Sequence, residues 1–158
     1  MANCSFPYLI TAYPYPPSLN KSYPTNRMGR RFPSQELTKF KNQAKLFAIK
    51  QDFIAMISDC QRVIKTEDTF LKIDLLFSIP KSAMYTKDQR IKKLDVDNRI
   101  KAVFDALSDL IKVDDKYFQV GSAMKCYNDT KDDFWVDIKV DMIPVEEYKL
   151  AKVSYLKP

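Results

Sequence analysis

Carboxylate side chains gather at both ends of one short segment, DVDNRIKAVFDALSDLIKVDD, which spans residues 95–115. Asp95 and Asp97 open the segment, and Asp114 and Asp115 close it. In an extended chain, side chains two residues apart share a face, so Asp95 and Asp97 can point to one place. A third carboxylate from the closing pair joins them if the next strand pairs near the start of the helix. Because clustered carboxylates repel one another, a shared divalent cation would stabilise such a group.

Magnesium, for which manganese can substitute, suits this set of donors. It is a hard, oxygen-seeking cation that is usually held by a few carboxylates, waters and substrate phosphates. Lys101 lies four residues after Asp97 and four before Asp105, so the three side chains follow one side of a helix. Lys101 would hold a scissile phosphate or stabilise developing charge. Residues 81–101 contain seven basic and three acidic residues, so positive charge borders the cluster, as phosphodiester hydrolysis needs.

Ordinary structural roles explain the same residues. Asp97 is a good helix N-cap, Lys101 and Asp105 make an exposed i,i+4 pair, and two successive aspartates are common in turns. Asp137 and Lys139 offer a second acidic–basic pattern, which reads equally well as the solvated face of a strand. From spacing alone, the metal site and the structural roles both stay open.

The composition excludes several classes of chemistry. The chain has 158 residues, of which 46% are hydrophobic, and we expect a single domain over 1–158, with a core over about 6–143 and a tail over 144–158. It has no histidine, which removes hydrolases and nucleases that need a histidine base. Its two glycines are too far apart for a glycine-rich phosphate loop, and its three cysteines suit free thiols in a reducing compartment.

The charge balance points to a polyanionic partner. The net charge is +6 and the pI is about 9.1, which favours nucleic acid or an acidic membrane face. No apolar run is long enough to span a bilayer. The first residues lack the basic region and cleavage site of a signal peptide. We therefore expect a soluble, cytoplasmic protein with no membrane partner.

The elements that must position the carboxylates follow from the pattern of apolar residues. Residues 70–78 alternate, with Leu71, Ile73, Leu75 and Phe77 on one face, as in a strand. Ser34 can cap a helix from 35 to about 60, in which the stripe positions are Phe40, Ala44, Phe47, Ala48 and Ile54. A second helix over 97 to about 111 carries the stripe Ile100, Val103, Phe104, Leu107, Leu110 and Ile111.

Three more strands complete the expected fold. They cover residues 6–13, 117–126 and 134–142, and in the last of these Val136, Ile138, Val140 and Met142 share a face. The loop YNDTKDD between the last two strands predicts a hairpin. The order is βαβαββ, which predicts an α/β protein with one mixed four-stranded sheet and flanking helices.

A basic, proline-rich loop follows the first strand, over residues 14–33. Its charged residues include Lys21, Arg27, Arg30 and Arg31, and it reads either as a DNA clamp or as a solvated surface loop. Its aromatic residues Tyr15, Tyr23 and Phe32 would wedge against unstacked bases or pack in the core.

Two separated motifs resemble one known family, the RusA-type Holliday junction resolvases, which are small endonucleases common in phages and prophages. The first is YPPSLNKSY, residues 15–23, which is similar to the family pattern P-P-S-x-N-x-x-Y. The second is the pattern D-x-D-N, then a lysine, then FDAL and a DD. It corresponds to Asp95, Asp97, Asn98, Lys101, Phe104 to Leu107, and Asp114 with Asp115. The resemblance covers residues 9–142 and extends to Lys125, a basic residue ten positions after the DD.

The resemblance implies a homodimer that cuts four-way DNA junctions with symmetric paired nicks, leaving 5′-phosphate and 3′-hydroxyl ends. It implies that Asp95, Asp97 and Asp115 ligate magnesium, with Asp114 as a further candidate, and that Lys101 is the catalytic lysine. Together with the basic loop, it leads us to expect DNA contacts from Asn20, Lys21, Arg30, Arg31, Lys92, Lys93, Asn98 and Lys125.

Some positions depart from the family pattern. Leu94 precedes the first aspartate, where many members have a basic residue, and Asp109 and Lys112 stand where many have Gly and Trp. Three alternatives remain: a non-catalytic protein that binds branched DNA, a nuclease of the same fold that acts on flaps or RNA, and a partner-binding module that uses the apolar helix face. The intact D-x-D-N and Lys101 argue against the first, the sequence is compatible with the second, and the third leaves the carboxylates unexplained.

Overall fold

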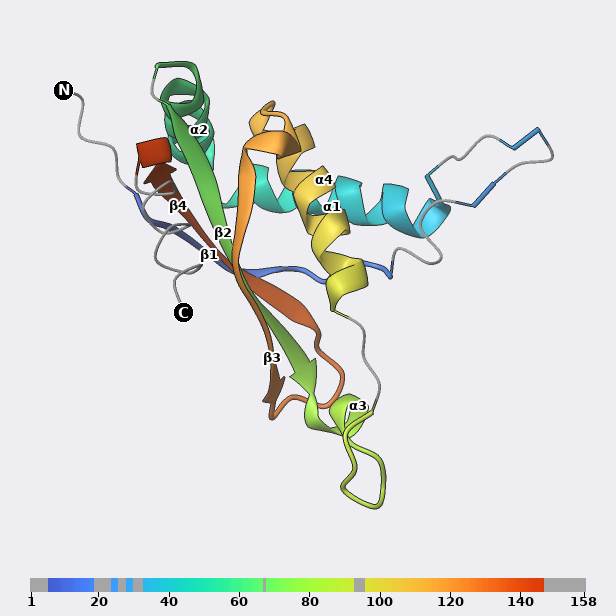
Figure 1. The fold of residues 1–158 in the computed structure, drawn as a ribbon. Helices are drawn as coiled ribbons and strands as arrows, with labels where there is room; N and C mark the ends of the chain where they lie inside the picture. The colour runs from blue at the N-terminus through green and yellow to red at the C-terminus, as the bar shows by residue number, and fades with distance from the viewer. Residues whose placement is uncertain are drawn as a thin grey trace, which may run out of the picture.

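The computed structural model describes residues 6–18, 24–25, 28–29, 33–66, 68–92 and 96–146. Four strands form one sheet in the order β1-β4-β2-β3, and helices pack on it (Figure 1). In chain order the elements are β1 (Tyr8–Pro14), α1 (Gln35–Lys50), α2 (Ile54–Thr66), β2 (Thr69–Pro80), α3 (Lys81–Met84), α4 (Asp97–Ile111), the 3-10 turn η2 (Asp115–Tyr117), β3 (Phe118–Asn128) and β4 (Trp135–Pro144). The predicted α/β class and mixed four-stranded sheet are confirmed.

The sheet mixes parallel and antiparallel pairs around β2. Strand β4 lies antiparallel to both β1 and β2, whereas β3 lies parallel to β2. Parallel neighbours need a long crossover, and here α4 is part of the connection from β2 to β3. The helix with the candidate catalytic residues therefore lies, in chain order, between two strands that are neighbours in the sheet.

The predicted hairpin between the last two strands is wrong. Strand β2 lies between β3 and β4, so these two strands are not neighbours. Alternating burial along β2 reports which face packs on the core, and it does not determine which strands pair at its edges. Strand β3 supplies one edge after the crossover, and β4 supplies the other.

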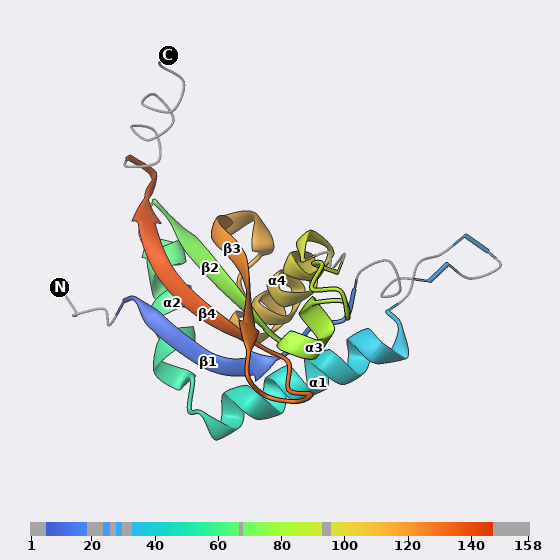
Figure 2. The ribbon, with the colours of Figure 1, turned by 90° about the horizontal axis from the view of Figure 1, so that it is seen from below.

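The core lies on the face of the sheet that the helices cover (Figure 2). Leu71, Ile73, Leu75 and Phe77 are each at most 1% exposed, which confirms the face predicted for this strand. The predicted face of β4 is also confirmed, because Val136, Ile138 and Val140 are buried and Met142 packs against the core. From α4, the buried stripe residues are Val103, Leu107 and Ile111, with Ile100 and Phe104 packed at the edge.

The predicted helix from 35 to about 60 is two helices. Ser34 does cap the first, because its hydroxyl accepts a hydrogen bond from the backbone N–H of Leu37 at 3.1 Å. The chain then turns at Asp52, which has a left-handed φ of 52°. After the turn, α1 packs against β1 and α2 packs against β2. Ile54, placed on the apolar stripe by its spacing, begins α2 and is 74% exposed.

The end of α4 redirects the chain without a glycine. Lys112 adopts a left-handed φ of 60°, and the Ser108 hydroxyl donates to the carbonyl of Val113 at 2.7 Å. The side-chain amide of Gln61, from α2, donates to the carbonyl of Ile111 at 2.7 Å. These contacts satisfy carbonyl groups near the helix end and send the chain back along α4.

Within the described residues, no helix is long and apolar enough to cross a membrane. Residues 147–158 of the predicted tail lie outside the described part, and β4 reaches Pro144.

The left-handed conformation of Lys112 predicts a stabilising substitution. Lys112→Gly should raise the free energy of unfolding by about 0.5–1 kcal/mol, because glycine adopts positive φ without a Cβ clash. The gain corresponds to about 1–4 °C in Tm, measured by thermal unfolding. The control is Lys45→Gly, on the exposed face of α1, which should lower stability by about 1 kcal/mol. An equal loss in both variants would contradict the argument.

Candidate active site

Lys101 is the centre of a charged cluster on α4. Its ammonium lies 2.9 Å from Oδ1 of Asp105 and 2.8 Å from Oδ2 of Asp115. Asp105 is one helical turn further along α4, and its side chain is only 15% exposed. Asp115 comes from the 3-10 turn that follows the helix. One ammonium therefore compensates carboxylates from two separate elements.

The chain brings Asp115 to Lys101 by folding back along α4. The rings of Phe104 and Phe118 pack edge to face, with centroids 5.5 Å apart, which anchors the returning segment on the helix. This register places the 3-10 turn beside the first half of α4. The helical spacing of Lys101 and Asp105 was visible in the sequence, but the position of Asp115 depends on this tertiary contact.

Hydrogen bonds from Lys101 to Asp115, and then to Asp105, raise the pKa of the ammonium above its ordinary value. The group is therefore a cation throughout the physiological range, and it cannot act as a general base there. It can hold an anionic oxygen or balance developing negative charge.

Asp114 has a local structural role. Its Oδ1 accepts a hydrogen bond from the backbone N–H of Lys116 at 2.9 Å, and its Oδ2 lies 3.7 Å from the ammonium of the same residue. The carboxylate caps the 3-10 turn and is 57% exposed. Asp115, rather than Asp114, is thus the member of the pair that contacts Lys101.

A polar cavity of about 450 Å³ lies beside the cluster. On its wall, the Lys41 ammonium from α1 lies 2.8 Å from a carboxylate oxygen of Asp109. The lining residues are Lys41, Asp105, Ser108, Asp109, Asp114 and Asp115. Asp109, which departs from the family pattern, therefore links α4 to α1.

Asp97 is the first residue of α4 and is exposed. The interpretation of Asp97 as an N-cap is wrong, because Val96 occupies that position and no side chain caps the helix there. Asp95, the other half of the D-x-D pair, lies outside the described residues, so its predicted approach to Asp97 stays a prediction.

The described residues do not by themselves form a metal site. Among residues 6–18, 24–25, 28–29, 33–66, 68–92 and 96–146, no group of three or more histidine, cysteine or acidic side chains is placed to share a metal. The donors near Lys101 are all carboxylate oxygens, the chemistry that magnesium prefers. The donor type therefore fits a hard divalent cation, and the full set needs a group beyond those described.

The predicted DNA contacts are spread over several elements. Lys92 is exposed before α4 and donates to the carbonyl of Ser82 at 2.9 Å. Asn98 is half-buried in the first turn of α4, and Lys125 is exposed on β3. The remaining candidates lie outside the described residues, namely Asn20, Lys21, Arg30, Arg31 and Lys93.

The second acidic–basic pattern has a structural explanation. Asp137 accepts a hydrogen bond from the backbone N–H of Ala12 at 2.9 Å and one from the Trp135 indole at 3.3 Å. It thereby supports the irregular pairing of β1 with β4. Lys139 pairs with Asp141 at 3.4 Å on the same strand.

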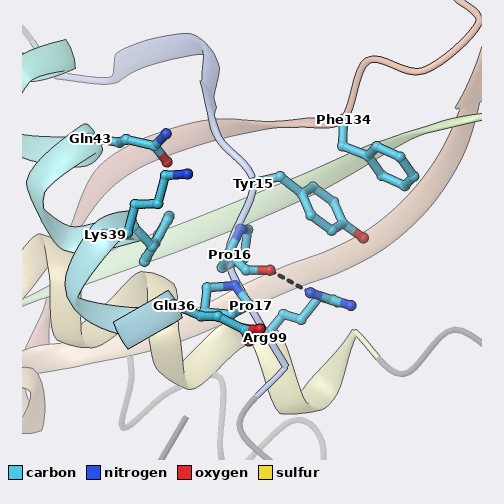
Figure 3. Close-up of a pocket in the computed structure, with 9 residues that line it drawn as sticks. Tyr15, Pro16, Pro17, Glu36, Lys39, Gln43, Arg99 and Phe134 are labelled. Atoms are coloured by element: carbon cyan, nitrogen blue, oxygen red, sulfur yellow. Dashed lines mark hydrogen bonds between the residues drawn. The ribbon is translucent and has the colours of Figure 1, made fainter. Parts of the chain in front are cut away.

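Sequence reasoning left Arg99 out of the site. The Arg99 guanidinium lies over the ring of Tyr15, with Cζ 4.9 Å from the ring centroid, and donates to the carbonyl of Pro16 (Figure 3). The available signal was its position, between Asn98 and Lys101 in the motif. Its contact with the loop after β1 could not be read from local pattern.

Comparison with known proteins identifies the family. The chain matches the family described as endodeoxyribonuclease RusA over residues 14–139, a span that includes both motifs and the Lys101 cluster. No curated protein matches the chain. The family match confirms the resemblance drawn from the two motifs. The chain therefore belongs to the RusA endodeoxyribonuclease family, whose activity is in general terms that of a Holliday junction endonuclease.

Proposed function

We propose that the protein resolves four-way DNA junctions by metal-dependent, symmetric nicks in two opposed strands. Water attacks the phosphorus, the bond from phosphorus to the 3′ oxygen breaks, and the products carry a 5′-phosphate and a 3′-hydroxyl. The observation that carries the proposal is the Lys101 ammonium held between Asp105 and Asp115, on a helix that begins at Asp97.

Magnesium, or manganese in its place, would be held by Asp97, Asp115 and the preceding Asp95, with Asp114 as a further candidate ligand. When bound, such an ion supplies a Lewis acid that activates water and neutralises phosphate charge. Lys101 contacts one of these proposed ligands, Asp115, and remains protonated. Its role is to hold a phosphate oxygen by charge.

The cut is symmetric only if two equivalent sites meet one junction. We propose a homodimer, because a two-fold dimer matches the approximate two-fold symmetry of a four-way junction. The chain has a net charge of +6, and its other basic residues bind the other backbone phosphates of the junction. The DNA substrate makes the cytoplasm the natural location.

Two other functions fit the family fold. A non-catalytic protein would bind branched DNA and cut nothing, and a nuclease of different preference would act on flaps or RNA. The intact motif residues Asp97 and Lys101 favour catalysis over binding alone. The substrate alternatives require a direct comparison of substrates.

Cleavage should depend on both the metal and the branched substrate. We expect paired symmetric nicks in a synthetic four-way junction with magnesium, and none with EDTA, when products are separated on a denaturing gel. A linear duplex and a flap of the same sequence are the substrate controls. Preferred cleavage of the flap would contradict the junction assignment, and tight binding without any nick in magnesium or manganese would indicate a non-catalytic protein.

Removing a proposed ligand should abolish cutting while binding survives. Asp97→Asn and Asp115→Asn keep the side-chain size and remove the charge, so cleavage should fall by about 100-fold or more. Junction affinity, measured by gel shift, should persist. Asp88→Asn is the matched control, since Asp88 is exposed in the connector before α4. Full cleavage by either ligand variant would overturn the assignment of that residue.

Loss of the Lys101 charge should slow the chemical step. Lys101→Met keeps the aliphatic stem, and we expect single-turnover cleavage to fall by about 10²–10³, the scale for one group that stabilises developing charge. Junction affinity should change little. The control is Lys116→Met, because Lys116 is 64% exposed and pairs only loosely with Asp114. Equal rates for the two variants would show that Lys101 has no special role.

A further inference from the structure

An open cavity of about 520 Å³ lies where the chain leaves β1, between α1 and the start of α4 (Figure 3). Small-molecule sites occupy roughly 300–1,000 Å³, so the space suits a group of nucleotide size. The lining residues are Tyr15, Pro16, Pro17, Glu36, Lys39, Phe40, Gln43, Arg99 and Phe134. A second cavity of about 520 Å³ continues along α1 and shares Tyr15, Gln43 and Phe134 with the first.

An aromatic pair separates the two cavities. The rings of Tyr15 and Phe134 have centroids 5.1 Å apart and are tilted by 57°. Phe134 comes from the connection before β4 and is 38% exposed, so part of its ring is open to a ligand. Exposed aromatic rings in a groove are the platforms on which unpaired bases stack.

Positive charge borders the same groove. Lys39 and Arg99 line the first cavity and Lys50 lines the second, whereas Glu36 is the acidic residue among the lining residues described. A basic groove with aromatic rings is the recurrent arrangement for single-stranded nucleic acid, because the cations follow the phosphates and the rings receive the bases.

Two buried polar atoms at the cavity have no partner among the described residues. They are the Tyr15 hydroxyl and Nε of Arg99. Burial raises the pKa of the Tyr15 hydroxyl, and Arg99 lowers it by a smaller amount, so the hydroxyl is a donor at neutral pH. A buried donor without a partner is unfavourable, so the wall of the groove is not fully hydrogen-bonded among the described residues.

The cavity is close to the proposed cleavage residues but on another side of the same helix. Arg99 lies between Asp97 and Lys101, and a step of two residues turns a helix by roughly 200°. A helix with its side chains is about 10–12 Å across. This distance equals about three nucleotides at the duplex rise of 3.4 Å per nucleotide. The groove and the proposed cleavage residues are therefore only a few nucleotides apart in straight-line distance.

We propose that this groove binds unpaired nucleotides of one DNA strand next to the branch point, with Phe134 stacked against a base. The inference rests on the proposed junction substrate and adds a second place of contact to it. Lys39 and Lys50 hold phosphates along α1, and Gln43 meets the polar edge of the base. Bases at a branch point are the ones most easily unstacked, so the groove favours branched DNA over duplex.

A double-mutant cycle between protein and DNA tests the stack. Affinity is measured in EDTA for junctions in which each nucleotide near the branch point is replaced in turn by an abasic residue. At one position, removal of the base should weaken the affinity of the wild-type protein for the junction more than it weakens the affinity of Phe134→Ala. The two losses should differ by about fivefold or more, the scale of one base–aromatic stack. Gln43→Ala, on the exposed face of α1, gives a second variant if Phe134→Ala folds poorly.

The control is Tyr127→Ala, because Tyr127 is a half-exposed aromatic residue at the end of β3 and does not line the groove. It should show the same abasic effect as wild type. Equal abasic effects in wild type, Phe134→Ala and Gln43→Ala at every position would overturn the inference, as would equal coupling to Tyr127. If the wild type binds junction and duplex with equal affinity, the proposed junction function is wrong. A protein that binds junctions specifically but shows no coupling contradicts the groove inference alone.

Discussion

The contact between Lys101 and Asp115 joins the two parts of the structure on which the site depends. The ammonium belongs to α4, and the carboxylate belongs to the turn that leads into β3. The Lys101 ammonium brings the carboxylates of Asp105 and Asp115 together from two separate elements. Because the pair is partly exposed, its contribution to stability is modest. Its main effect is to place a permanent cation beside carboxylates that suit a divalent metal.

The sheet explains why that contact forms where it does. Strands β2 and β3 are parallel, so the chain must cross over between them, and α4 lies in this crossover. Burial of Val103 and Leu107 fixes which side of α4 faces the sheet, and Asp97, Lys101 and Asp105 are left on another side. The edge-to-face rings of Phe104 and Phe118 then set the register of the return segment. Apolar packing therefore determines the positions of the charged groups.

Local pattern predicted the strands and the faces of α4 well, because burial imposes a period on the sequence. It failed where a distant contact decides. The break at Asp52 has no proline or glycine to mark it, and the left-handed turn is set by packing of α1 and α2 on different strands. The false hairpin arose because YNDTKDD has ordinary turn chemistry, whereas the strand order β1-β4-β2-β3 is set by tertiary packing that no local pattern reports.

The candidate site also contains residues that the sequence predicted and a contact that it did not. Lys101 and Asp105 were readable as an i,i+4 pair, and the resemblance supplied Asp115 before any contact was known. The partner of Arg99 was not readable, because Tyr15 is more than eighty residues away in the chain. A resemblance to a family identifies the residues that its members share. Contacts made through a loop become known only from the three-dimensional structure.

The strand order also governs when the protein can become active during its own synthesis. Strand β4 is the last strand of the described chain, yet it lies between β1 and β2 and pairs with both. Until that strand leaves the ribosome, β1 has no partner and one edge of β2 stays open. The helix with the catalytic candidates is translated earlier, but the sheet beneath it is completed only at the end. A chain that ends before β4 therefore lacks the strand that joins β1 to β2.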